Sequence, residues 1–194
     1  MKSQKLNFRF GMITVIVLIA AMTRLIPHPA NFSPVGAMAL FGSAYYSKRY
    51  LAFLIPVISM WISDLFLNNI VYSAFFNHFV WFYPGSIFTY ISFILIALMG
   101  MSLLKKISIR NLFVSALLAS VIFFIVSNFG VWFSSGMYPR NLEGLISCYI
   151  AGIPFFKNTI FGNLFYTITM FGLFELFAKK FNWLRLSTAS CINE

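Results

Sequence analysis

The chain has few charged residues, and almost none of them are acidic. Only 4 of its 194 residues are Asp or Glu, against 14 Lys and Arg, and charged residues make up 9% of the sequence. Hydrophobic residues make up 60% and aromatic residues 20%, with a mean hydropathy of +0.86. A soluble domain of this composition would aggregate, so the composition indicates a protein whose solvent is lipid.

The sequence also offers little material for a metal, redox or hydrolytic site. Cys148 and Cys191 share no CxxC spacing, and His28 and His78 have no helical i, i+4 relation to each other or to a carboxylate. No GxSxG, HExxH, Walker A or GxGxxG motif occurs. We therefore expect no metal, no cofactor and no enzymatic activity of this chain alone.

The basic residues form short clusters separated by apolar stretches. Because short cytoplasmic loops are rich in Lys and Arg, the clusters place an even number of membrane crossings between neighbours. Six crossings satisfy this, with both termini in the cytoplasm and the chain in the bacterial inner (plasma) membrane. The positive charge then faces anionic lipid head groups of the bilayer, and we expect no nucleic-acid partner. The clusters are Lys2, Lys5 and Arg9; Lys48 and Arg49; Lys105, Lys106 and Arg110; and Lys179, Lys180 and Arg185.

We predict an all-α integral membrane protein, a six-transmembrane-helix bundle that forms one domain over residues 1–194. The second helix is too short to cross the bilayer alone, so other helices must shield it. Its small residues, among them Gly36 and Gly42, permit close packing inside the bundle or docking of a partner. The apolar stretches predict helices over residues 10–26, 34–46, 50–66, 85–104, 111–132 and 159–178.

The connections on the two sides of the membrane are unequal. The cytoplasmic turns are tight, whereas the outer loops 1, 3 and 5, over residues 27–33, 67–84 and 134–158, hold many prolines and aromatic residues. Long loops in so small a protein are usually functional. These loops either form an aromatic belt at head-group depth or cover a pocket for an amphipathic small molecule, and we favour the pocket.

Six side chains near the outer end are candidates for substrate binding. Arg24 and Asp64 lie at similar depth near the outer ends of the first and third helices, where a lone charge would cost about 3 kcal/mol, so we expect them to pair. The pair either fixes the helix register or orders the polar end of the pocket. We expect the asparagines to hydrogen-bond the ligand and the tryptophans to offer flat apolar contact. The candidates are Arg24, Asn31, Asp64, Trp81, Asn128 and Trp132.

Four segments together resemble an uncharacterised bacterial family of suspected membrane transport proteins. They are RLIPHPANFSPVGAMALFG at 24–42, Ser63-Asp64, SNFGVW at 127–132 and YIAGIPFF at 149–156. More distantly, the chain is similar to the S-components of energy-coupling factor (ECF) vitamin transporters, among which the cobalamin-type solitary S-component is nearest. That resemblance implies uptake of a vitamin-like solute, with a separate ATPase and transmembrane coupling module as partner.

The sequence therefore predicts an S-component-like membrane transport protein that binds a small amphipathic solute in an outward-facing pocket. Two other hypotheses stay open. One is a membrane enzyme that uses Cys148 or a histidine at the outer surface. The other is an assembly subunit that transports nothing and docks a partner on its second helix.

Overall fold

The computed structural model describes residues 2–181 and residue 184, so Arg185 and Cys191 lie outside the described residues. In this part of the chain there are six α-helices and no strands. All of the helices except α2 are long and apolar enough to cross a membrane, as in a multi-pass membrane protein. The helices are α1 (Lys2–Met22), α2 (Val35–Tyr45), α3 (Arg49–Phe66), α4 (Ser86–Leu103), α5 (Ile109–Ser134) and α6 (Leu142–Lys180).

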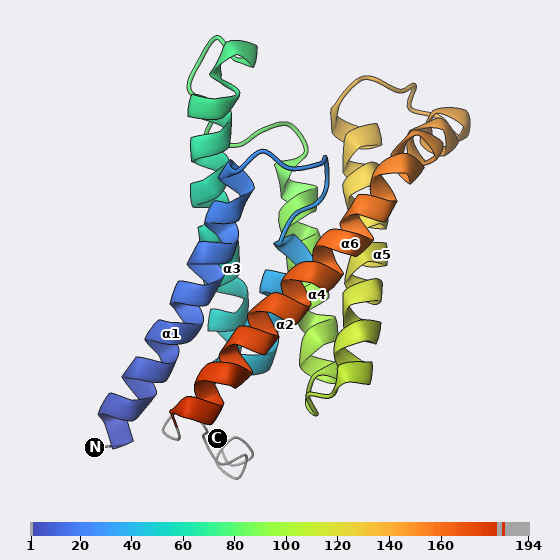
Figure 1. Ribbon diagram of the computed structural model, residues 1–194. Helices are drawn as coiled ribbons and strands as arrows, with labels where there is room; N and C mark the ends of the chain where they lie inside the picture. Colours follow the sequence, from blue (N-terminus) through green and yellow to red (C-terminus); the bar gives the residue numbers. More distant parts are fainter. Residues whose placement is uncertain (1, 182–183, 185–194) are drawn as a thin grey trace.

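Successive helices run in opposite directions through the bundle (Figure 1). One end of the bundle therefore holds the start of α1, the α2–α3 turn, the α4–α5 turn and the end of α6. We call it the basic end because it carries the described basic clusters. The other end, the loop end, holds the connecting segments 26–34, 72–85 and 135–141. All of the described basic clusters thus share one side, which is the arrangement that the positive-inside bias requires.

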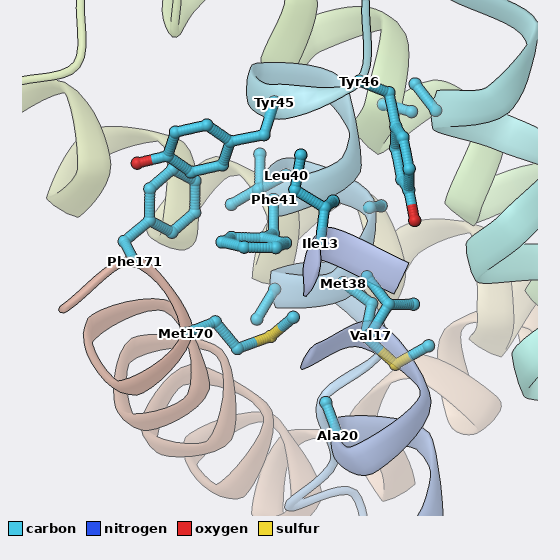
Figure 2. Close-up of a cluster of buried hydrophobic side chains, with 14 of the residues drawn as sticks. Ile13, Val17, Ala20, Met38, Leu40, Phe41, Tyr45, Tyr46, Met170 and Phe171 are labelled. Atoms are coloured by element: carbon cyan, nitrogen blue, oxygen red, sulfur yellow. The ribbon is translucent and has the colours of Figure 1, made fainter. Parts of the chain in front are cut away.

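Helix α2 lies at the centre of the bundle and packs against the other five helices. Figure 2 shows its Phe41 and Tyr45 in a cluster with Ile13 of α1 and Phe171 of α6. The Phe41 ring meets the Phe171 ring edge-on, with centroids 5.3 Å apart. With 11 residues, α2 is about 16 Å long, against a hydrocarbon core of about 30 Å. Its neighbours therefore shield a helix that cannot cross the membrane alone.

The small residues of α2 serve packing inside the protein. A Cβ added to Gly36 would lie 2.5 Å from Oδ1 of Asn163 on α6, and one added to Gly42 would lie 3.1 Å from the carbonyl oxygen of Ala52 on α3. Both glycines are buried. These two glycines therefore allow close contact between helices inside the protein, and neither of them is exposed to a partner.

The sixth helix is much longer than the predicted range 159–178, because it begins at Leu142. Asn141 starts it as an N-cap, its side-chain oxygen accepting a hydrogen bond of 2.8 Å from the Gly144 amide. Glu143 in the first turn complements the positive end of the helix dipole. The predicted loop over 134–158 is thus mostly helix, and α6, about 58 Å long, crosses the bundle diagonally (Figure 1).

The third helix also continues into its predicted loop. A π-helical turn (η2, Leu67–Val71) follows α3 directly, and a short 3₁₀ turn (η3, Ser73–Phe75) comes next. A second 3₁₀ turn (η1, Thr23–Leu25) prolongs α1. The η1 turn carries the candidate residue Arg24, whereas Asp64 lies in the last turn of α3.

We expect Gly36→Ala to lower the stability of the protein by about 1–3 kcal/mol. The new methyl group must displace Asn163, which is buried and donates a hydrogen bond of 2.9 Å to Ser120 Oγ. Gly11→Ala is the matched control, because a Cβ there meets nothing within 4 Å. The control should be neutral or slightly stabilising through its better helix propensity. Thermal unfolding in detergent measures both, and equal midpoints for the two variants would contradict the packing role of Gly36.

Candidate functional site

A cavity of about 570 Å³ lies near the loop end, within the size range of small-molecule sites. Its wall draws residues from helices α2 to α6, from the turns that follow α1 and α3, and from the connecting segments. The apolar lining residues are Ala30, Val35, Met60, Leu67, Pro84, Gly85, Phe123, Val131, Ala151, Gly152 and Phe155. The polar lining residues are Arg24, His28, Asn31, Ser33, Tyr72, Tyr83, Thr89, Ser127, Asn128, Tyr138 and Cys148.

The expected pairing of Arg24 and Asp64 is formed. Arg24 lies in η1, and its Nη2 is 2.6 Å from Oδ1 of Asp64 in the last turn of α3. Nη1 of Arg24 donates to Ser63 Oγ at 2.6 Å and to the Met60 carbonyl at 3.4 Å. The Tyr90 hydroxyl of α4 donates to the other carboxylate oxygen at 3.1 Å. The side chains of the two charged residues are only 13% and 4% exposed, so water screens the pair little.

The pair ties three helices together and cancels its own charge. Arg24 lines the cavity, whereas Asp64 stands behind it, outside the lining residues. The cavity wall therefore carries a guanidinium whose charge is already balanced. Next to it, the Tyr83 hydroxyl donates to Thr89 Oγ1 at 3.0 Å, and burial raises the pKa of Tyr83 above its usual value, helped by the charge of Asp64. Tyr83 is thus a neutral hydrogen-bonding group at ordinary pH.

Asn128 lies where α5 and α6 approach each other closely. Its Nδ2 donates to the Phe124 carbonyl at 2.7 Å, which fixes the carboxamide. Its Oδ1 faces Gly152 of α6, where any added Cβ would collide with the carboxamide. Asn128 lines the cavity, and within the described residues no hydrogen bond to its Oδ1 is formed. On the same side, Cys148 Sγ donates to the Asn128 carbonyl at 3.4 Å.

Asn31 lies in a tight turn that faces the cavity. The Phe32 amide donates to the Pro29 carbonyl at 3.0 Å, and Asn31 has a φ of 64°. These features are those of a type II turn with Asn at the third position, a residue that tolerates left-handed backbone. The Asn158 side chain of α6 donates to the Ala30 carbonyl at 3.0 Å and anchors the turn. Segment 26–34 is therefore held against α6 rather than left free.

The structure places both candidate tryptophans, Trp81 and Trp132, outside the cavity wall. Trp81 is 59% exposed and stacks on Trp61, whose Nε1 donates to the Trp81 carbonyl at 3.2 Å. Trp132 Nε1 donates to the Pro139 carbonyl at 3.0 Å and so braces the α5–α6 connection. Tyrosine and phenylalanine side chains supply the aromatic surface of the cavity in their place.

Several cavity residues carry no signal that sequence reasoning could have used. Phe123, Met60 and Thr89 lie in apolar helices, where nothing in the pattern separates an inward position from a lipid-facing one. His28 does line the cavity, and its Nδ1 lies 2.7 Å from the Ile26 carbonyl. Among the described residues, no three His, Cys, Asp or Glu side chains come together as a metal site.

We expect Asp64→Leu alone to destabilise the protein by about 3–5 kcal/mol, because it leaves the buried Arg24 guanidinium without its partner charge. The double variant Arg24→Met with Asp64→Leu should recover most of that loss, since it removes both charges together. Thermal unfolding in detergent compares the three proteins. A double variant less stable than Asp64→Leu would show that the pairing in this structure does not govern the stability of this region.

The comparisons with known proteins identify the family of the chain. Residues 4–186 match the family described as "Family of unknown function (DUF6580)". No curated protein and no solved structure matches the chain. The match extends from the first turn of α1 past the end of α6 and includes all residues of the cavity wall. The chain therefore belongs to the DUF6580 family.

Proposed function

We propose that this protein is a solute-binding transport protein of the bacterial inner membrane, S-component-like in its action, which binds a small amphipathic, vitamin-like molecule in the cavity at the loop end. The observation that carries the proposal is the cavity itself, with its balanced charge, its free amide oxygen and its aromatic surface. Five helices are long and apolar enough to cross a membrane, which supports the membrane location.

The backbone around the cavity supports this proposal. Non-helical backbone within a membrane-embedded bundle is tolerated where it is buried in protein or lines a water-filled cavity. Segment 26–34 meets that condition, since His28, Ala30, Asn31 and Ser33 all line the cavity. Transporters commonly build solute sites from interrupted helices of this kind.

The beginning of α2 adds hydrogen-bond donors at the same place. Pro34 occupies the N-cap position and makes no side-chain cap, and Val35, the first residue of the helix, lines the cavity. The first N–H groups of a helix have no partner within the helix and point outward from its N-terminal end. A carbonyl or hydroxyl oxygen of the ligand can accept from them.

The lining selects the chemical class of the solute. In the described part of the chain, Arg24 is the only Lys, Arg, Asp or Glu that lines the cavity, and Asp64 already balances it. A ligand with a large net charge would therefore be desolvated without a counter-charge. Tyr83, Asn128 and Ser127 serve hydrogen bonds, whereas Phe123 and Phe155 serve apolar rings or chains. The proposed solute is uncharged or zwitterionic, with one polar and one apolar part.

Orientation and energy coupling complete the proposal. With the basic end in the cytoplasm, as the positive-inside bias favours, the cavity faces outward and both termini lie inside. The sequence has no nucleotide-binding motif, so a separate ATPase and transmembrane coupling module would supply the energy, as the likeness to S-components implies. Transport would then require rocking of the bundle.

The test is mass spectrometry of the small molecules that copurify with the protein in detergent. Ala151→Phe introduces a ring from α6 into the cavity and should remove the bound solute, with a loss of at least about tenfold. Ile150→Phe is the matched control, because Ile150 is 61% exposed and absent from the cavity wall. A bound solute in the wild type and the control but not in Ala151→Phe supports the proposal. Identical small-molecule profiles in all three proteins contradict it.

A thiol measurement separates this proposal from a membrane enzyme that uses Cys148. The thiol lines the cavity but is only 2% exposed and is engaged with the Asn128 carbonyl. In a Cys191→Ser background, we expect Cys148 to react with a maleimide far more slowly than in the detergent-denatured protein. Cys148→Ala should keep the copurifying solute. Fast labelling together with loss of function in Cys148→Ala would favour the enzyme.

A further inference from the structure

A second hollow, near the basic end, is separate from the solute cavity. It is a groove of about 400 Å³ between α5 and α6, and none of its lining residues lines the cavity at the loop end. Its walls include Leu112 and Ala116 of α5 and Leu164 and Phe171 of α6. Among the described residues, the only ionisable one that lines it is Glu175, near the end of α6. The groove is therefore shaped and coated for a hydrocarbon chain.

The flanks of the groove face away from the bundle. Phe113 on α5 is 53% exposed and Ile168 on α6 is 69% exposed, and both helices are long and apolar enough to cross a membrane. The groove therefore opens sideways to lipid.

The charges at the mouth are mainly positive. Ile107 and Ile109 form the lip of the groove, and the exposed Lys106 and Arg110 stand directly beside them in the chain. Lys179 lies one helical turn beyond Glu175 and is also exposed. The carboxylate of Glu175 accepts a hydrogen bond of 3.0 Å from Tyr45, so a hydroxyl of the protein already engages it. An anionic group at the mouth would meet an excess of cations.

We infer that this groove binds an anionic phospholipid, with one acyl chain between α5 and α6 and the phosphate against Lys106, Arg110 and Lys179. The inference is independent of the proposed transport function. The apolar groove would hold the acyl chain, and the three cations would bind the phosphate of the head group. Because the groove lies near the basic end, both parts of the lipid would lie in one leaflet.

Native mass spectrometry of the detergent-purified protein tests the site. Titration with phosphatidylglycerol should give one retained lipid per chain, at concentrations at which phosphatidylcholine with the same acyl chains is not retained. Gly172→Leu fills the groove from its wall, and a Cβ there meets nothing within 4 Å, so the fold should accept it. We expect at least tenfold weaker phosphatidylglycerol binding. Gly11→Leu, on α1 and equally unobstructed, is the control and should bind as the wild type does.

The head-group contact needs its own variants. Lys106→Gln with Arg110→Gln should reduce phosphatidylglycerol retention to the level of phosphatidylcholine. Lys48→Gln with Arg49→Gln removes the same charge from the α2–α3 turn and should change little. Equal retention of the two lipids by the wild type overturns the anionic specificity. Unchanged phosphatidylglycerol binding by Gly172→Leu overturns the assignment of the groove as the lipid site. A wild-type dimer that Gly172→Leu abolishes also overturns it, because a second copy of the chain would then occupy the groove. Ala151→Phe should leave lipid retention intact, which separates this test from that of the solute cavity.

Discussion

The burial of α2 is the constraint on which the rest of the structure depends. A helix of 11 residues cannot cross a bilayer, so the other five must surround it, and Gly36 and Gly42 let them approach closely. The same shortness leaves the bundle interior unfilled on the loop side of Val35, where α2 begins. Segment 26–34 returns into that space, and the cavity lies around it. The solute site is therefore a direct consequence of a helix that is half the usual length.

Polar contacts then fix the wall of the cavity at two opposite places. Arg24, Asp64 and Tyr90 join α1, α3 and α4, and the Asn128–Gly152 approach joins α5 to α6. Because apolar side chains gain nothing from leaving lipid for a protein interior, such polar contacts and close packing have to specify the arrangement of membrane helices. They also bring the polar groups that a solute could use to one depth.

The positions of the charged residues and the lengths of the apolar stretches made much of the fold predictable. Features within uniformly apolar segments could not be predicted from the sequence. The common side of the basic clusters and the short second helix could be predicted from the sequence alone. The pairing of Arg24 with Asp64 could be predicted as well, since lone charges at that depth are costly. The start of α6 was missed because Pro154 and the polar residues after it interrupt the apolar run inside a continuous helix. The outward position of Trp81 could not be predicted, because the residue lies in the connecting segment 72–85, where no periodicity indicates which side chains face inward.

Helix α6 connects the two hollows of the molecule. Cys148, Ala151 and Gly152 contribute to the solute cavity, and Leu164, Phe171 and Gly172 contribute to the apolar groove, all on one helix of 39 residues. A rigid displacement of this helix at the loop end would also move the wall of the groove. Pro154, which lacks an amide hydrogen, interrupts the hydrogen-bond ladder between the two sets of residues, and helices bend most readily at such a position. Bending there would let the cavity wall move while the groove keeps its shape, so the stiffness of α6 at Pro154 sets how strongly an occupant of one hollow affects the other.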